Sequence, residues 1–117
     1  PSIGKPRDAQ RLEQIFNYIN ANFRESISSS ELAAQLGMTT NSFCRFFKAN
    51  THKSFLTFLN DYRLARAKEL LANNQHPIKE IMFSCGFRDP AYFSRYFREK
   101  VGVSPTVWRN RQREEVR

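Results

Sequence analysis

The chain has 117 residues, of which 40% are hydrophobic and 14% aromatic, enough to build the core of one domain or of two very small ones. Its formal net charge of +8 favours an anionic partner, such as nucleic acid or an acidic membrane surface, although a basic protein with a merely solvated surface is an alternative. The sequence contains no apolar run near the ~18 residues of a membrane span and no leader peptide, so we expect a cytoplasmic protein.

Residues 1–7, PSIGKPR, are turn-rich and basic and are typical of a linker or of the leading end of an expressed fragment. From Asp8 onward, apolar residues at helical spacing predict a first helix that ends near Phe23 and closes a core. These residues are Leu12, Ile15, Phe16, Ile19 and Phe23.

A helix-turn-helix pattern follows between residues 28 and 50. Ser28 and Glu31 form a capping box for a short helix that ends at Gly37, a residue that adopts a left-handed conformation without strain. Thr39 then caps a second helix that runs to about Asn50. Two short helices joined by a tight glycine turn are typical of a helix-turn-helix. In the second helix the inward face is Phe43, Phe46 and Phe47, and the outward face is Asn41, Cys44, Arg45 and Lys48.

The longest helical pattern, residues 54–73, lies at the centre of the chain, and Ser54 caps its start. Its apolar face changes direction half-way, from Phe55, Phe58, Leu59 and Tyr62 to Leu64, Ala67, Leu70 and Leu71. Such a helix is expected to pack its two apolar faces against two separate cores. We therefore divide the chain into a leading segment (1–7), a first subdomain (8–53), a linker helix (54–73) and a second subdomain with a basic tail (74–117).

The second subdomain shows the same signals as the first. Pro77 suits the first turn of a helix that ends at Gly86, and the Asp89-Pro90 pair begins another helix that ends at Gly102. A last helix, opened by Ser104-Pro105, carries Val107 and Trp108 and is followed by the polar tail RNRQREEVR.

The two halves contain the same unit twice. Six positions of the first half recur, with the same or a similar residue, fifty positions later. They are Phe43, Arg45, Phe46, Phe47, Lys48 and Ser54, which correspond to Phe93, Arg95, Tyr96, Phe97, Arg98 and Ser104. The outward face recurs as well, as Ala91, Ser94, Arg95 and Arg98. A repeat marks a repeated supersecondary unit, and two copies joined by a rigid helix predict two heads that read two similar surfaces.

The outward faces carry the side-chain chemistry of DNA recognition. An arginine matches the two acceptors of guanine, an asparagine pairs with adenine and an alanine contacts the thymine methyl group, which makes Arg45, Asn41 and Ala91 candidates for base contacts. Thr40, Lys48, Ser94 and Arg98, together with helix N-termini, are candidates for phosphate contacts. Cys44, Arg88 and Arg95 complete the candidate set. For any single polar residue a solvated surface is the simpler reading, but the doubled spacing favours a role for Arg45 and Arg95.

The run GFRDPAYFSRYFREKVGVSPTVWR resembles the signature of the AraC/XylS family of bacterial transcription regulators, and RLARAKELL resembles that family's linker helix. The resemblance covers roughly residues 12–109. It implies an all-α domain of seven helices, with two helix-turn-helix units whose recognition helices enter adjacent segments of the major groove. It places the family's base-reading arginine on Arg45 and on Arg95. The chain departs from the family pattern at His52, where glycine is usual, and at Cys44, Pro90 and Ala91, where polar side chains often contact bases.

Three classes of function remain open. The first is a sequence-specific transcription regulator, expected to be an activator, which binds double-stranded promoter DNA and contacts RNA polymerase. The second is a basic helical module that binds an acidic protein such as a polymerase subunit. The third is a DNA-modifying enzyme that uses Cys44 or Cys85 as a methyl acceptor. The chain lacks an initiator methionine and is compatible with the tail of a longer protein. If a domain precedes it, we expect that domain to dimerise and to bind the unidentified effector.

We expect no enzyme and no cofactor, because no catalytic grouping or phosphate-binding loop is visible. The two cysteines lack the spacing of a zinc site or a disulfide framework. His52 and His76 are far apart in sequence, and Cys85 fits a small core residue. An exposed Cys44 beside two cations is a candidate redox-sensitive thiol.

Overall fold

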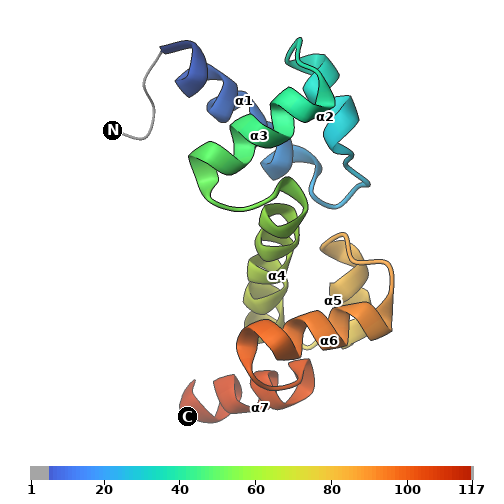
Figure 1. Cartoon of the computed structure of the whole chain (residues 1–117). Coiled ribbons are helices and arrows are strands. Elements are labelled where there is room, and N and C mark those ends of the chain that lie inside the picture. Colours follow the sequence, from blue (N-terminus) through green and yellow to red (C-terminus); the bar gives the residue numbers. More distant parts are fainter. Residues whose placement is uncertain (1–5, 117) are drawn as a thin grey trace. The chain divides into compact units, whose positions relative to one another are not determined.

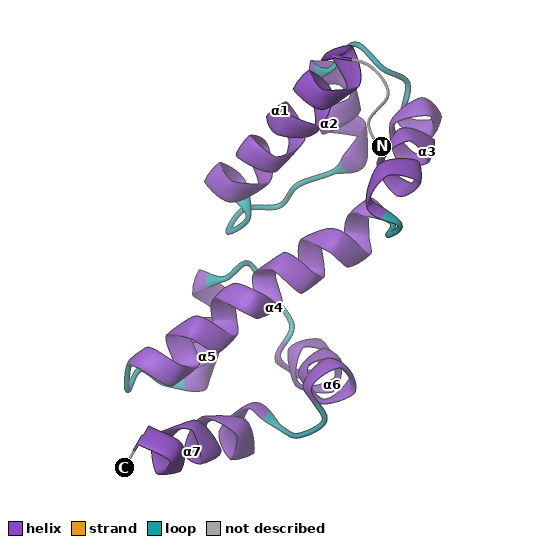
Figure 2. Ribbon diagram, turned by 90° about the vertical axis from the view of Figure 1, so that its left-hand side faces the viewer, coloured by secondary structure: helices purple, strands orange, loops and turns teal. Residues whose placement is uncertain are grey.

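The computed structural model describes residues 6–116, and these form helices joined by short loops, without a strand in that range (Figures 1 and 2). The seven helices are α1 (Pro6–Asn22), α2 (Ser29–Gln35), α3 (Thr40–Thr51), α4 (Phe55–Asn73), α5 (Ile78–Ser84), α6 (Pro90–Val101) and α7 (Pro105–Val116). The predicted all-α, seven-helix fold is confirmed. By its contacts the chain divides into two compact units, Pro1–Asp61 and Tyr62–Arg117, and the boundary lies within α4.

The first unit contains a helix-turn-helix made of α2 and α3, which pack against each other. The Ser28 hydroxyl caps α2 by accepting the Glu31 amide at 3.1 Å, and the Thr39 hydroxyl caps α3 by accepting the Ser42 amide at 3.1 Å. Gly37 lies between the two helices with φ of 70°, in the left-handed region that favours glycine. The capping and turn signals of the sequence are therefore confirmed at these residues.

The core of the first unit is built from aromatic and branched side chains on α1 to α4. Phe43 and Phe47 of α3 are fully buried, and the ring of Phe55 lies edge-on to both, with centroids 5.4 and 5.5 Å away. The other core residues are Leu12, Ile15, Ile19, Phe23, Leu32, Ala33 and Leu59. Because buried rings fill α3's inner face, its outer face is left for solvent.

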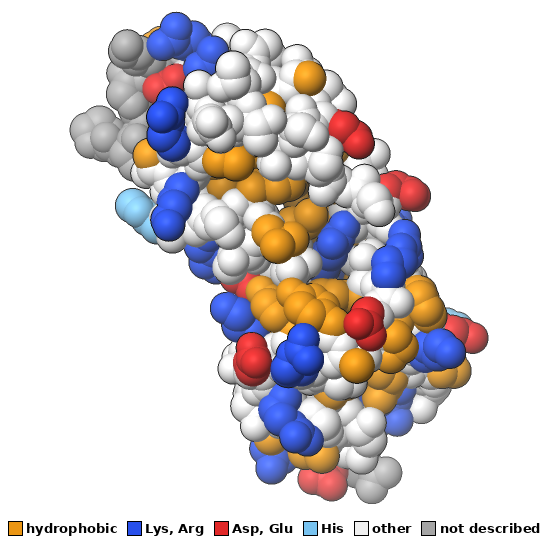
Figure 3. Space-filling model, turned by 45° about the vertical axis from the view of Figure 1, so that its right-hand side comes forward, with side chains coloured by type: hydrophobic (Ala, Val, Ile, Leu, Met, Phe, Trp, Pro, Cys, Tyr) orange, Lys and Arg blue, Asp and Glu red, His pale blue; other side chains and the backbone are white. Residues whose placement is uncertain are grey.

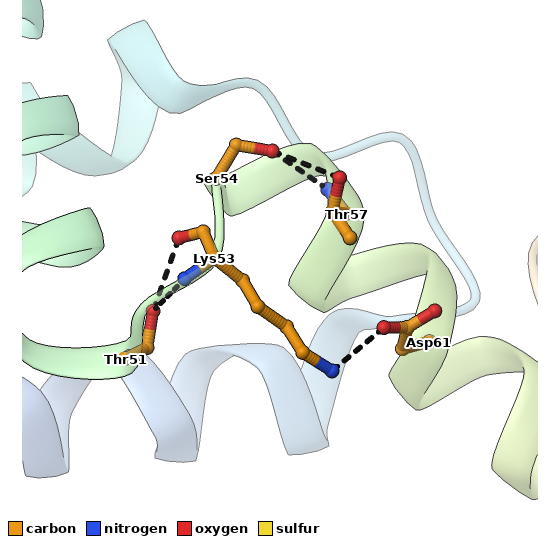
Figure 4. Close-up of polar contacts among 5 residues, drawn as sticks. All are labelled: Thr51, Lys53, Ser54, Thr57 and Asp61. Carbon is orange, nitrogen blue, oxygen red and sulfur yellow. Dashed lines mark hydrogen bonds and ion pairs between the residues drawn. The ribbon is translucent and has the colours of Figure 1, made fainter.

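A polar network fixes the junction between α3 and α4 (Figure 4). The Ser54 hydroxyl accepts the Thr57 amide at 3.2 Å and so caps α4, as the sequence predicts. Lys53 forms an ion pair of 2.8 Å with Asp61 in the second turn of α4. The Lys53 amide also donates to the Thr51 hydroxyl at 3.3 Å. These contacts hold the chain between the end of α3 and the start of α4.

The second unit repeats this construction with α5 and α6, which also pack together. The Asp89 carboxylate caps α6 by accepting the Ala91 amide at 3.0 Å, and Pro90 occupies the first helical position. Gly86 and Gly102 follow α5 and α6 with φ of 97° and 100°. The prediction for Pro77 is wrong by one position, because it is the residue before α5 and its side chain caps no amide.

The core of the second unit surrounds Phe93 and Phe97 of α6. The Phe93 ring lies 4.9 Å from that of Phe87, and the Phe97 ring lies 6.0 Å from that of Trp108 on α7. The other buried apolar residues are Leu64, Ala67, Leu71, Ile81, Met82 and Cys85. The later turns of α4 thus serve this core, whereas Phe55 and Leu59 in its first turns serve the other.

The prediction that the last helix gives way to a polar tail after Trp108 is wrong, because helix α7 continues to Val116. Arg109 on this helix is buried, and its Nε donates to the carbonyl oxygen of Leu71 at 3.1 Å. Arg113 donates to the carbonyl oxygen of Asn74 at 3.1 Å. The last carbonyls of a helix carry partial negative charge, so these arginines satisfy the end of α4. Val107 on the same helix is 41% exposed.

Candidate nucleic-acid interface

Helices α3 and α6 each bury an aromatic face and expose the opposite one. Their inner residues recur every three or four positions, so the residues between them must point outward. The structure places all ten candidate side chains of the sequence on the exposed surface, namely Thr40, Asn41, Cys44, Arg45, Lys48, Arg88, Ala91, Ser94, Arg95 and Arg98. Nine of them lie on α3 or α6, and Arg88 lies in the loop that precedes α6.

On α3 the exposed cations form no ion pair, hydrogen bond or ring contact with the described side chains. Among the side chains of residues 6–114, Arg45 and Lys48 have no carboxylate partner, hydrogen-bond acceptor or aromatic ring within contact distance. Asn41 and Cys44 lie one turn or less from Arg45 on the same face. An unpaired guanidinium keeps five N–H donors available in one plane, the geometry that matches a base edge or a phosphate.

On α6 the exposed cations line a hollow. A cavity of about 310 Å³ is lined by Ser94, Arg95, Arg98 and Ser104. Neither arginine has a carboxylate within ion-pair distance in the part of the chain that the structure describes. The Ser104 hydroxyl accepts the Val107 amide at 3.2 Å, which leaves its own hydrogen for another acceptor. This arrangement offers several donors to one anionic group.

Ser104 was not among the residues predicted for the site. The signal was present in the sequence, because Ser104 is the repeat of Ser54 and stands three positions after the end of α6. The sequence reasoning assigned it only to the start of α7. Its approach to Arg95 and Arg98 depends on how the chain turns after Gly102, which helical spacing does not describe.

The Arg88 side chain is held by a hydrogen bond to the protein backbone. Its Nη1 donates to the carbonyl oxygen of Phe83 at 3.3 Å, near the end of α5. Burial lowers the pKa of Arg63, and the nearby positive charge of Arg88 lowers it further. Arg88 therefore adds fixed positive charge beside the start of α6.

The cysteine and histidine residues do not come together. Cys44 is exposed on α3, and Cys85 is only 1% exposed in the core of the second unit. His76 is exposed, and its Nδ1 lies 3.8 Å from a carboxylate oxygen of Glu80. Within residues 6–116 no three His, Cys, Asp or Glu side chains are grouped as metal ligands would be.

Positive charge is unevenly divided between the units. Residues 1–61 contain seven basic and five acidic side chains, a net charge of +2, whereas residues 62–117 contain twelve and six, a net charge of +6. Figure 3 shows Lys and Arg side chains spread over the visible surface of each unit. No helix among the described residues has the length and apolar character needed to cross a bilayer.

Comparison with known proteins identifies the family. A family profile described as a helix-turn-helix domain matches residues 32–111. The transcriptional activator RhaR of Mannheimia succiniciproducens is 30% identical over 104 residues, which make up 89% of this chain and 38% of RhaR. The chain thus spans less than two fifths of the length of this curated relative.

Two solved structures resemble the fold closely. The C-terminal domain of the response regulator yesN from Fusobacterium nucleatum is 27% identical, with a TM-score of 0.81 over 86% of this chain and 98% of that one. The DNA-binding domain of the transcriptional factor AdpA, solved in complex with a target DNA, is 28% identical, with a TM-score of 0.83 over 90% and 94%. These findings confirm the resemblance inferred from the second-half signature, and the chain belongs to the AraC/XylS family of helix-turn-helix transcription regulators.

Proposed function

We propose that the chain binds double-stranded promoter DNA sequence-specifically, with α3 and α6 as recognition helices in two successive segments of the major groove. The observation that carries the proposal is the repeated exposed face of these helices, with Arg45 and Arg95 at equivalent positions and, among the described side chains, without acidic partners. A helix fits the major groove, where an arginine fork pairs with O6 and N7 of guanine. AdpA, whose DNA-binding domain resembles this fold, was solved with its target DNA.

The remaining candidates divide by chemistry between bases and phosphates. Asn41 and Ala91 face outward near the starts of their helices, where side chains of a recognition helix approach base edges. Thr40, Lys48, Ser94 and Arg98 carry donors suited to phosphate oxygens, and Ser104 joins them because it lines the same cavity as Arg98. Cys44 lies within this surface on α3 and Arg88 beside α6.

The role proposed for α4 is that of a linker helix between the two readers, which are the first subdomain (8–53) and the second (74–117). It is a single helix of 19 residues without a proline or glycine, about 29 Å long at ~1.5 Å per residue. Successive major-groove segments on one face of B-form DNA recur every ~34 Å. Since the two readers are repeats in one chain, their half-sites should form a direct or asymmetric element rather than a palindrome.

Activation is the regulatory outcome that the relatives favour. RhaR and RhaS, which match most of this chain, are both named transcriptional activators. An activator bound at a promoter acts by contacting RNA polymerase, and we include that contact in the proposal. This function places the protein in the bacterial cytoplasm, where the promoter DNA is.

The experiment that tests base reading is selection of bound fragments from random DNA by the wild-type protein and by two single variants. Arg45→Ala and Arg95→Ala should each relax the preference at one position, in different halves of the selected site, by ~1 to 3 kcal/mol. Lys48→Ala is the control, since loss of a phosphate contact weakens all sequences alike. Selection of the wild-type consensus with undiminished discrimination by both arginine variants would contradict the assignment.

A further inference from the structure

Tyr92, one turn before Arg95 on α6, contacts the Arg95 side chain, and the equivalent position of the first unit has no such contact. In α6 the Cζ atom of Arg95 lies 5.6 Å from the centroid of the Tyr92 ring. This distance is within the ~6 Å over which a guanidinium is attracted to the face of an aromatic ring. The equivalent position before Arg45 is Ser42, and Arg45 has no ring partner in the described part of the chain.

The Tyr92 ring is itself held in place from the core of the second unit. It stacks on Tyr96 with centroids 5.7 Å apart and planes inclined by 20°. Tyr96 lies 6.3 Å from the ring of Phe87, which is 3% exposed and packs on Phe93. The Arg95 guanidinium therefore rests on an aromatic column that is anchored in buried side chains.

The contact leaves the recognition chemistry of Arg95 free. A guanidinium interacts with a ring through its face, whereas its five N–H donors lie in its plane and point away at the edge. Arg95 also has no carboxylate partner among the side chains of residues 6–114. A free arginine side chain loses rotamer freedom when it docks on a base, and a restrained one has less to lose.

We propose that Tyr92 is a positioning residue for base recognition, which restrains the Arg95 side chain in the orientation that reads its base pair. The proposal rests on the function proposed above, because it takes Arg95 as a base reader. The second unit then has a preorganised reader and the first unit a flexible one. Tyr92 contributes to the difference in affinity between the right and wrong base, and not to affinity for DNA in general.

The test measures discrimination at each half-site separately, as the ratio of dissociation constants for the selected base pair and for a substituted one. Tyr92→Leu keeps apolar bulk but removes the ring, and should lower discrimination at the Arg95 position by about two- to fivefold, the value of an exposed cation–aromatic contact. Tyr92→Phe keeps the ring face and should match the wild type. Discrimination at the Arg45 position should not change in either variant.

A double-mutant cycle separates positioning from a structural role. In the Arg95→Ala background, Tyr92→Leu should have no further effect on discrimination, because no guanidinium remains to be positioned. Circular dichroism and the thermal midpoint of each variant establish that α6 is folded. If Tyr92→Leu lowered discrimination at both half-sites, or lowered it equally without Arg95, the proposal would be overturned.

If the proposed base reading by Arg95 is itself wrong, the measured discrimination changes in a different way. If Arg95→Ala left discrimination unchanged, Arg95 would not be a base reader, and both the proposed contact and its positioning would be overturned. If Arg95→Ala lost discrimination while Tyr92→Leu kept it, only the positioning role would be lost.

Discussion

Helix α3 starts at a threonine cap and ends at His52 in a left-handed conformation, with φ of 66°. Helix α6 starts at an aspartate cap followed by proline and ends at Gly102, with φ of 100°. Both have two fully buried phenylalanines at the same two positions, Phe43 and Phe47 or Phe93 and Phe97. Their exposed faces share only an arginine at one position, Arg45 or Arg95, and a basic residue at another, Lys48 or Arg98.

The difference teaches which parts of the repeat are constrained by folding. The buried rings are constrained because each one packs against several neighbours, so that a change of shape leaves a cavity or a clash. The exposed positions have fewer such neighbours, and apart from the shared Arg45 and Arg95 they differ in charge, size or hydrogen-bonding groups. Under the proposed function, the two units would recognise different base sequences while they keep one architecture.

The largest expected effect lies in the shared core. Phe47→Ala and Phe97→Ala should each lower the free energy of unfolding by ~3 to 5 kcal/mol, because a buried ring is replaced by a cavity. Each change should loosen its own unit first, since the two cores have separate residues. Hydrogen exchange of backbone amides measures this directly. Uniform loss of protection across both units would instead indicate one cooperative core.

The second effect concerns the proposed linker. Adding about five base pairs between the half-sites turns one groove segment to the far side of the duplex, which has ~10 to 10.5 base pairs per turn. We expect the affinity of a monomeric preparation to fall to that of one unit alone, while about ten added base pairs restore the groove phase and serve as the control for length. Footprinting measures the protected bases. Protection of both half-sites on the five-base-pair template would rule out α4 as a rigid linker.

A smaller effect should distinguish phosphate contacts from base contacts. Lys48→Ala and Arg98→Ala should each reduce the slope of log affinity against log salt concentration by about one, because one fewer counterion is released. The selected base sequence should stay the same. Titrations at several salt concentrations measure the slope, and Glu99→Gln on the same helix is a control that removes charge without removing a phosphate donor. An unchanged slope for Arg98→Ala would show that Arg98 does not contact a phosphate group.

The smallest expected effect concerns the residues that follow α3 and α6, which are His52 and Gly102. A left-handed conformation is strained for residues with a Cβ atom, so His52→Gly should stabilise the first unit by about 0.5 to 1 kcal/mol. Gly102→Ala should destabilise the second by about 1 kcal/mol through the backbone alone, since an added Cβ would meet no atom within 4 Å. Urea denaturation measures both changes. Equal signs for the two substitutions would mean that strain at these caps does not control stability.

Local sequence signals predicted most of the fold. The caps at Ser28, Thr39, Ser54 and Asp89 and the turns at Gly37 and Gly102 depend on neighbouring residues only, and they are found where expected. The inward faces of α3 and α6 follow from helical spacing. The exposure of the ten candidate site residues is a consequence of the same spacing.

The features that sequence reasoning missed depend on contacts between distant residues. Arg109 stands in a polar run, and nothing near it in sequence indicates that its guanidinium is buried against the carbonyl of Leu71. The contact of Tyr92 with Arg95 joins residues one turn apart, but its support comes from Phe87 in another segment. Ser104 reaches the cavity beside Arg98 through the turn after Gly102. Spacing along one helix places Tyr92 within reach of Arg95, but it cannot predict the support from Phe87 or the other two contacts.

The arginines of α7 also have a consequence for folding during synthesis. The carbonyls of Leu71 and Asn74 receive their donors from residues 38 and 39 positions later in the chain. At ~5 to 20 residues per second, a ribosome needs about 2 to 8 seconds to make that stretch. The first unit is then complete while the end of α4 still awaits its partners. Slow synonymous codons between residues 74 and 109 would lengthen this interval without altering any contact in the finished protein.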